Sequence, residues 1–416
     1  MTDPPRTTAV TNARLRGRQG LWTVTIAADG IIASIAEATS AGEPVQPDAV
    51  DAAAVDADGG LVIPAFIDSH LHLDLAYSLD LVAPNTSGTL AEAIRHWADA
   101  KRELSSENVR QRARRAIDDE IAFGVGFIRT HVDVGTAAGL RLCHGVLAAR
   151  DETRGRIDIQ VVAFPQDGLL SDPGAVDQMG EAMRMGCDLI GGIAHYERTD
   201  ADRRQHIKMI FDLAEAFDAD IDCHIDETDD PDSRCTEVLA AHAIERGWQG
   251  RVTASHVCAL ASYDDAHAAR VIALLAEGGV HVVTNPGVNL HLQGRQDRYP
   301  KRRGLTRVSE LMDAGVNVSA GQDCIKDPFY PMGTGNMLEV GHLLIHADHL
   351  STPGDIERVA DCITDNPSKA LRLADYGLAV GKRANLVVLE AADVAEAFRT
   401  RRAPVCRIRN GCVLGC

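Results

Sequence analysis

The sequence has no CxxC pair, although 10 cysteines are spread over its 416 residues. Their irregular spacing in so long a chain favours reduced, cytosolic thiols over a disulfide framework. It also has no run of about 18 apolar residues, so no membrane-spanning helix is predicted. Its first residues, Met-Thr-Asp-Pro-Pro-Arg, lack the apolar core of a secretory signal. We therefore expect a cytoplasmic protein without a membrane partner.

The chain also has no excess of positive charge. The net charge is −18, which argues against nucleic acid or an anionic membrane surface as a partner, because both bind positively charged proteins. No low-complexity segment and no solenoid-type repeat is present. The apolar share of 45% is ordinary and suffices for two domains, or for a large barrel with a smaller unit. A small-molecule partner is expected, and the sequence leaves a homo-oligomer open.

The middle of the chain alternates between strand and helix patterns. Eight strand candidates are found at 61–69, 126–134, 157–163, 187–194, 219–224, 251–256, 280–284 and 316–321. Helical patterns separate several of them, at 90–103, 107–123, 202–216, 233–246, 266–277 and 308–313. Eight strands, each followed by a helix or a long connection, predict an α/β fold of the (β/α)₈ TIM-barrel type.

Both ends of the chain are rich in strand patterns. Residues 21–35 alternate around Asp29-Gly30, and residues 405–414 alternate around Asn410-Gly411, as in hairpins with tight turns. We expect the two ends to form one small β-sandwich domain. The predicted division is 1–60 and 372–416 for this domain and 61–371 for the barrel.

Two histidines, His70 and His72, follow the apolar strand at 61–69. In an extended strand alternate side chains point the same way, so both imidazoles can face one point. They form a candidate half of a metal site. The alternative is an ordinary pair of loop histidines.

Other predicted strands also end in polar side chains, at the edge of a barrel where active sites lie. Histidines recur there at positions 131, 195, 224 and 256, with Glu227 and Asp323 in the same register. One such histidine is usually a satisfied hydrogen-bonding group. Histidines at five strand ends, with carboxylates beside them, indicate a shared site.

With these motifs the chain resembles the metal-dependent amidohydrolases, and within them the bacterial cytosine deaminase branch. The stretches that carry the resemblance are His70–Asp74, Arg129–Asp133, Ala163–Gln166, His224–Glu227, Thr253–His256, Asn289–Arg295, Tyr299–Gly304 and Asp327–Pro331. The resemblance covers nearly the whole chain. It implies a metal-dependent aminohydrolase that uses metal-bound hydroxide to deaminate a free cytosine-type base, giving uracil or thymine and ammonia.

The resemblance also implies roles for single residues. His70, His72, His224 and Asp323 are implied to bind one divalent ion, zinc or iron. A second metal is not expected, because residues 187–195 contain no lysine. Glu227 is implied to shuttle protons. His256 is implied to hydrogen-bond the attacking water or the intermediate, and Asp323 to accept the proton of the water. Gln166 is implied to read the base through its carboxamide.

The chain departs from the resemblance at two positions. Cys324 stands where the cytosine deaminases have an aspartate, and Phe329 where they have a tryptophan. Both changes make the predicted pocket less polar and roomier, which suits an apolar substituent such as the methyl group of 5-methylcytosine. A methyl group is worth only about 1–3 kcal/mol of discrimination, so cytosine is expected to remain a substrate.

Several alternatives stay open at this stage. The same site could act on another cyclic amidine, such as creatinine or isoguanine, or on a cyclic amide. A barrel that only binds would be expected to have a broken ligand set, and this one is complete. Cys324 could be a reactive thiol or a metal ligand. His342, His346 and His349 are expected on a packed amphipathic helix, and Lys301–Arg303 in a solvated or salt-bridged loop.

Overall fold

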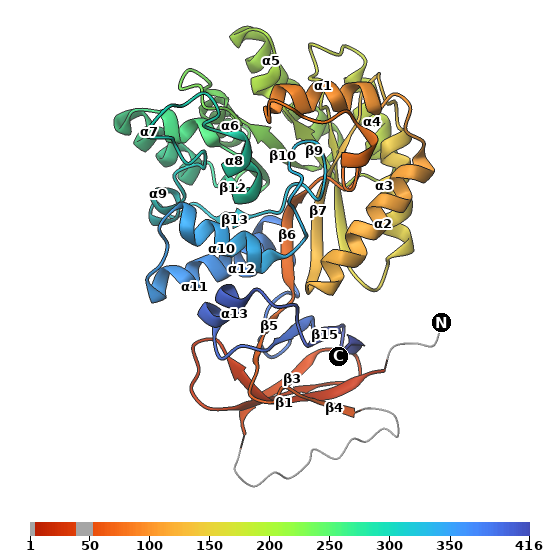
Figure 1. The fold of residues 1–416 in the computed structure, drawn as a ribbon, viewed down its shortest axis with the longest axis vertical. Helices are drawn as coiled ribbons and strands as arrows, with labels where there is room; N and C mark the ends of the chain where they lie inside the picture. The colour runs from red at the N-terminus through yellow and green to blue at the C-terminus, as the bar shows by residue number, and fades with distance from the viewer. Residues whose placement is uncertain (1–4, 39–52) are drawn as a thin grey trace.

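The computed structural model describes residues 5–38 and 53–416, and it shows a barrel stacked on a smaller β domain (Figure 1). Part of the predicted segment 1–60, namely residues 1–4 and 39–52, lies outside the described residues. Within the described ranges, no helix is both long and apolar enough to cross a membrane.

The barrel consists of eight parallel strands in chain order. They are β6 (Phe66–Leu71), β7 (Val125–Asp133), β8 (Asp158–Phe164), β9 (Leu189–Gly192), β10 (Asp220–Ile225), β11 (Val252–His256), β12 (His281–Thr284) and β13 (Val318–Ala320). The last strand meets the first, because the backbone N–H of Asp323 donates to His70 O at 2.7 Å and that of His72 donates to Asp323 O at 2.9 Å. The predicted TIM barrel is confirmed.

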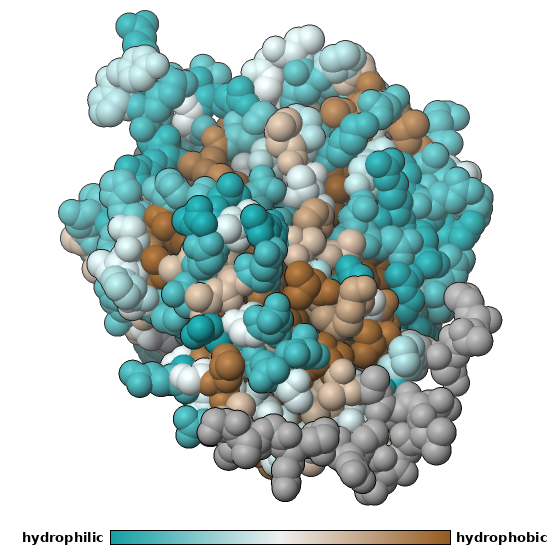
Figure 2. All heavy atoms as spheres, turned by 60° about the horizontal axis from the view of Figure 1, so that its bottom comes forward, coloured by the Kyte–Doolittle hydropathy of each residue, from teal (hydrophilic) through white to brown (hydrophobic). Residues whose placement is uncertain are grey.

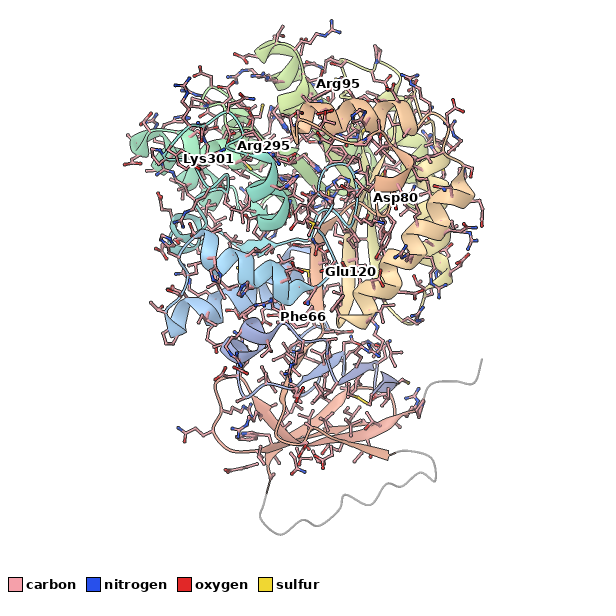
Figure 3. All side chains as sticks on the ribbon, in the orientation of Figure 1. Phe66, Asp80, Arg95, Glu120, Arg295 and Lys301 are labelled. Atoms are coloured by element: carbon pink, nitrogen blue, oxygen red, sulfur yellow. A yellow bond between two sulfur atoms is a disulfide. The ribbon has the colours of Figure 1, made fainter. Side chains whose placement is uncertain are left out.

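Helices surround the strands and pack their apolar faces on them. They are α2 (Ser106–Ala122), α3 (Arg141–Glu152), α4 (Ala175–Met185), α5 (Asp200–Phe217), α6 (Cys235–Glu245), α7 (Asp265–Glu277), α9 (Val308–Asp313), α10 (Met337–Ala347), α11 (Pro353–Cys362) and α12 (Asp365–Ala370). Two more, α1 (Leu90–Ala100) and α8 (Pro286–Leu292), lie toward the C-terminal ends of the strands. Phe66 marks the opposite end of the barrel from Arg95 and Arg295 (Figure 3).

The two chain ends build the smaller domain together, as predicted. Its strands are β1 (Thr7–Leu15), β2 (Trp22–Ile26), β3 (Ile32–Glu37), β4 (Ala53–Asp56), β5 (Leu61–Pro64), β14 (Leu386–Leu389), β15 (Cys406–Arg409) and β16 (Cys412–Gly415). They run in the order β16-β15-β14-β5-β1-β2-β3, with β4 beside β1, and enclose a small apolar core. Helix α13 (Val394–Thr400) packs between this domain and the barrel helices α10 and α11.

The candidate strand 61–69 is in fact two strands. β5 pairs with β1 and β14 in the terminal domain, whereas β6 starts the barrel at Phe66. The division predicted at residue 61 therefore assigned β5 to the wrong sheet. Ala65 separates the two strands, and the continuous apolar run hid the change of partner because both strands are buried.

One cysteine pair departs from the expectation of reduced thiols. Cys406 and Cys416 form a disulfide. Arg407 pairs with Gly415 in the β15–β16 hairpin, so the two cysteines just outside this pair face each other. The other eight cysteines are free thiols.

Polar side chains cover most of the face that Figure 2 shows, with hydrophobic patches between them.

Candidate active site

The site begins where β6 ends. The register between β6 and β7 shifts between Asp68 and Leu71, so the strand pairing is irregular where His70 lies. The carboxylate of Asp68 links this segment to the segment after β13, because its Oδ1 accepts from the backbone N–H groups of His70 at 3.2 Å and Gln322 at 3.0 Å. His72 follows the strand, and its ring centroid lies 5.4 Å from that of His70. The two predicted imidazoles therefore lie together.

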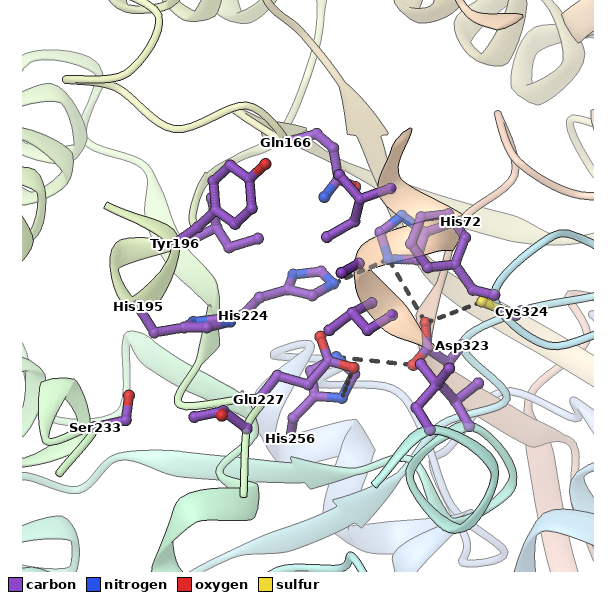
Figure 4. A pocket seen from close by; sticks show the side chains of 18 of the residues that line it. His72, Gln166, His195, Tyr196, His224, Glu227, Ser233, His256, Asp323 and Cys324 are labelled. Atoms are coloured by element: carbon purple, nitrogen blue, oxygen red, sulfur yellow. Dashed lines mark hydrogen bonds and ion pairs between the residues drawn. The ribbon is translucent and has the colours of Figure 1, made fainter. Parts of the chain in front are cut away.

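The four side chains predicted as metal ligands converge. His72 Nε2 and His224 Nε2 are 3.0 Å apart. Asp323 Oδ1 lies 3.6 Å from His72 Nε2 and 3.7 Å from His70 Nε2. Ligand atoms at about 2.0–2.2 Å from one zinc ion are separated by roughly 3–4 Å from each other. Figure 4 shows His72, His224 and Asp323 pointing at one another.

The environment of these rings favours the neutral form that a metal requires. His70 Nδ1 lies 3.0 Å from Ser255 Oγ, whose hydroxyl donates to Asp222 Oδ1 at 2.9 Å. The serine therefore accepts from His70 Nδ1–H, and Nε2 keeps its lone pair toward the cluster. His70 Nε2 is buried without a hydrogen-bond partner among the described residues. Burial, and then the neighbouring imidazoles, lower the pKa of His70, His72 and His224 well below the usual value. This donor set fits a divalent metal ion.

A second group lies beside the ligands, on the C-terminal ends of β10 and β11. His256 Nδ1 is 3.5 Å from Glu227 Oε1, and His256 Nε2 is 3.7 Å from Asp323 Oδ2. The amide of Asn289 lies 3.0 Å from His256 Nδ1. Burial raises the pKa of Glu227 to about 8. Burial, followed by the charge of Glu227, also raises the pKa of Asp323. These groups are placed to hold or pass protons.

The cluster opens into a cavity of about 470 Å³. Gln166, Cys324 and Phe329, the residues predicted to contact the base, all line it. Much of the rest of the wall is apolar, from Leu75, Leu90, Ile94, Ile193, Val288 and Leu292. Burial raises the pKa of Cys324, which disfavours the reactive thiolate that the sequence left open.

The sequence placed His131 and His195 at strand ends near the site without a role, and the structure shows what they contact. His131 joins His70, His72 and His224 in one cluster of donor atoms within 4.8 Å of each other, and its Nε2 lies 3.3 Å from Asp222 Oδ1. Its position at the end of β7 was the available signal. His195 and Tyr196 line the cavity after β9, and burial lowers the pKa of His195 to about 4. Leu90 and Ile94 of α1 line it as well, and no sequence pattern pointed to them.

Two further sequence interpretations concern residues away from the cluster. Arg302 of the basic run forms an ion pair with Asp297, and Arg303 donates to the carbonyl of Ala347, as expected for a salt-bridged loop. His342 lies on α10, which packs on α8 and α11, and Arg401 donates to it. The basic run and His342 agree with the expectation, and His346 is an exposed residue of α10, but His349 lies beyond the end of the helix at Ala347, contrary to the prediction.

The comparisons with known proteins agree on one protein family. Residues 53–413 match the model of the amidohydrolase family. The structure is similar to that of 5-methylcytosine deaminase from Klebsiella pneumoniae liganded with 5-fluorocytosine, with a TM-score of 0.91, 42% identity and coverage of 98% of this chain and 97% of that chain. The sequence is 32% identical to pterin deaminase of Rhizobium rhizogenes, covering 94% of this chain and 87% of that protein. It is 29% identical to N-isopropylammelide isopropyl amidohydrolase of Pseudomonas sp. strain ADP, covering 86% and 87%.

Proposed function

The chain belongs to the amidohydrolase family, and we propose that it is a metal-dependent deaminase of a free cytosine-type base. Its substrate is cytosine or 5-methylcytosine, and its products are uracil or thymine and ammonia. The observation that carries this proposal is the placement of Gln166, Glu227 and the histidine cluster around one cavity. The 42% identity to a 5-methylcytosine deaminase supports it.

His70, His72, His224 and Asp323 would hold one divalent ion, zinc or iron. Such an ion supplies Lewis acidity that brings the pKa of water toward neutrality. The converging Nε2 atoms of His72 and His224, 3.0 Å apart, support this ligand set. The strand that could carry a bridging lysine, β9, reads Leu-Ile-Gly-Gly, which supports a single ion.

The remaining groups handle protons. Glu227 in its protonated form, which burial favours, donates its proton to the ring nitrogen next to the amino-bearing carbon. Water then adds to that carbon, and its proton passes by way of Asp323 to the amino group. As the carbon–nitrogen bond breaks, ammonia leaves, and the new hydroxyl group gives its remaining proton back to Glu227, so that a carbonyl remains and the carboxyl group is protonated again. His256 stabilises the charge that develops on the added oxygen.

We assign base recognition to three other residues that line the cavity. The carboxamide of Gln166 presents a donor and an acceptor side by side, which matches a ring N–H next to a carbonyl. Cys324 and Phe329, both buried, face the cavity with a neutral thiol and an apolar ring. We propose that they accept the 5-methyl group, which favours 5-methylcytosine by about 1–3 kcal/mol over cytosine.

A second candidate is a larger cyclic amidine. The cavity of about 470 Å³ has room beyond a single pyrimidine ring, and the chain is 32% identical to a pterin deaminase. The same proton chemistry would serve pterin or isoguanine, because each carries an amino group on a ring carbon next to a ring nitrogen.

A panel assay separates these candidates. Purified protein loaded with zinc or iron is given cytosine, 5-methylcytosine, isoguanine, creatinine and pterin, and ammonia release is followed. Ammonia from the two cytosine compounds, with the higher kcat/KM for 5-methylcytosine, is the expected result. Release from pterin alone would replace the leading proposal with the second candidate. No release from any compound would contradict both.

A further inference from the structure

Lys101, at the C-terminal end of α1, is a buried cation outside the cavity. Its side chain is only 1% exposed, and its Nζ donates to Asp133 Oδ2 at 2.8 Å and to Asp167 Oδ2 at 2.6 Å. Burial acts to lower the pKa of Lys101, but the two carboxylates outweigh this and raise it, so the ammonium stays charged. A buried ion pair of this kind adds little net stability compared with an apolar replacement, so stability alone does not explain it.

The spacing of residues in α1 links Lys101 to the cavity. Trp97 and Lys101 are four residues apart and share one face of the helix. The indole N–H of Trp97 donates at 3.0 Å to the same Asp133 oxygen that Lys101 binds. Leu90 and Ile94, also four residues apart, form a neighbouring face that lines the cavity. One face therefore anchors the helix while the other covers the site.

Asp133 and Asp167 connect Lys101 to two parts of the site, the imidazole cluster and the loop that carries Gln166. Asp133 ends β7, two residues after His131 of the imidazole cluster. Asp167 directly follows Gln166, which is buried and lines the cavity. The ammonium of Lys101 therefore joins three elements: α1, the end of β7 and the loop that carries Gln166. Lys101 itself does not line the cavity.

We propose that Lys101 is a positioning residue that fixes Gln166 and the cavity-facing side of α1, and so sets the affinity for the base. This inference rests on the proposed function for the identity of the base. A lysine suits the task because its one ammonium group binds two carboxylates on separate elements. Without it, the Gln166 loop and α1 lose their shared anchor, and the carboxamide is no longer held against the base.

The test compares Lys101→Met, which removes the charge at similar length, with Lys101→Arg, which keeps the charge. For Lys101→Met we expect KM for 5-methylcytosine to rise about tenfold, with kcat within about threefold of the parent protein and an unchanged metal content. Hydrogen exchange should become faster in residues 90–101 and 165–171. Lys101→Arg should restore both KM and protection. Lys208→Met, on an exposed lysine of α5, is the matched control and should change neither.

The inference is overturned if Lys101→Met leaves both KM and exchange in these two segments unchanged, or if it lowers activity only through loss of metal. If the single variant does not fold, Lys101→Met combined with Asp133→Asn removes the unpaired buried charge, and the same outcomes apply. The exchange measurement needs no substrate. An inactive parent protein would therefore contradict the proposed function, while the exchange data would still decide the role of Lys101.

Discussion

Glu227 is the residue whose replacement tests the proton chemistry. It is 7% exposed, lies 3.5 Å from His256 and has its pKa raised to about 8 by burial. A glutamine of the same shape cannot release or take up the proton. We therefore expect Glu227→Gln to lower kcat by about 10²–10⁴-fold. Ammonia release and metal analysis on the same sample check this, and the metal content should not change.

The matched control is Glu277→Gln, on the exposed C-terminal end of α7. It removes one carboxylate from the same barrel and should leave kcat unchanged. Full activity in Glu227→Gln, with metal bound, would show that another group carries the proton.

Cys324 tests the discrimination between bases. Its side chain is 2% exposed, and its Sγ lies 3.6 Å from Asp323 Oδ1. An aspartate here adds charge beside the proposed 5-methyl pocket, so Cys324→Asp should lower the kcat/KM ratio of 5-methylcytosine to cytosine by about tenfold. Cys324→Ser, similar in size and neutral, should shift the ratio less. Steady-state kinetics with both bases give the answer, and an equal ratio in all three proteins would remove Cys324 from the selectivity argument.

At this scale, spacing and strand register predicted much of the candidate site. His70 and His72 were predicted to converge because they are two residues apart at a strand end, and they do. The position of His131 near the site followed from its place at a strand end, but its contact with Asp222, a buried carboxylate on a distant strand that also contacts Arg129, could not be derived in this way. Partners of this kind become visible only in three dimensions.

Among the elements, the loop after β8 is held by one carboxylate. Glu197 Oε1 accepts from the backbone N–H groups of Leu169 at 2.6 Å and Leu170 at 2.9 Å, and from His206 Nδ1 at 2.8 Å. Gly168 has a φ of +85°, and a Cβ there would lie 2.8 Å from Glu197 Oε1. Burial raises the pKa of Glu197, but these hydrogen bonds outweigh burial and lower it to about 2.

The lowered pKa of Glu197 predicts that this residue makes a pH-dependent contribution to the stability of the fold. Because the pKa of the folded protein lies below the ordinary value of 4.5, the contribution is fully present above 4.5 and is lost as the pH falls toward about 2. We expect Glu197→Gln to lower the free energy of unfolding by about 2–3 kcal/mol at pH 7. Urea unfolding should show a smaller difference from the parent protein at pH 4.

Glu181→Gln, on an exposed carboxylate of α4, serves as the control and should differ little from the parent protein at either pH. A difference for Glu197→Gln that stays constant from pH 7 to pH 4 would mean that the carboxylate is not held in its charged form by this loop.

The strands and helices of the barrel were predictable because their periodicities differ. The features that sequence patterns missed share one cause. Each of them depends on a contact with a residue far along the chain. The sequence of β5 resembles the start of a barrel strand, and only its pairing with β14 shows that it belongs to the terminal domain. Helix α1 reads as an ordinary amphipathic helix. Its proposed anchoring depends on the contact between Lys101 and Asp133, which are 32 residues apart in the chain.

For the whole molecule, the proposed metal ligands come from β6 and the residue after it, the end of β10 and the segment after β13, so a bound ion would tie distant parts of the barrel together. Asp323 is buried beside His70 and His72. Removing the metal with a chelator should therefore lower the free energy of unfolding by about 3 kcal/mol or more. Urea unfolding with chelator, and again after adding zinc, checks the loss and its recovery.

The control for this prediction is His72→Asn, which removes one proposed ligand. Its stability should be low from the start and should respond weakly to the chelator. A parent protein that contains metal by elemental analysis, yet keeps its stability in chelator, would place the metal elsewhere than at His70, His72, His224 and Asp323.

The central proposal is that residues around this cavity deaminate a cytosine-type base by hydrolysis. Its most direct test is a reaction of the metal-loaded protein with 5-methylcytosine in ¹⁸O-labelled water, with the products identified by mass spectrometry. We expect thymine that carries one labelled oxygen, with an equal amount of ammonia. Unchanged 5-methylcytosine, or thymine without the label, would contradict it.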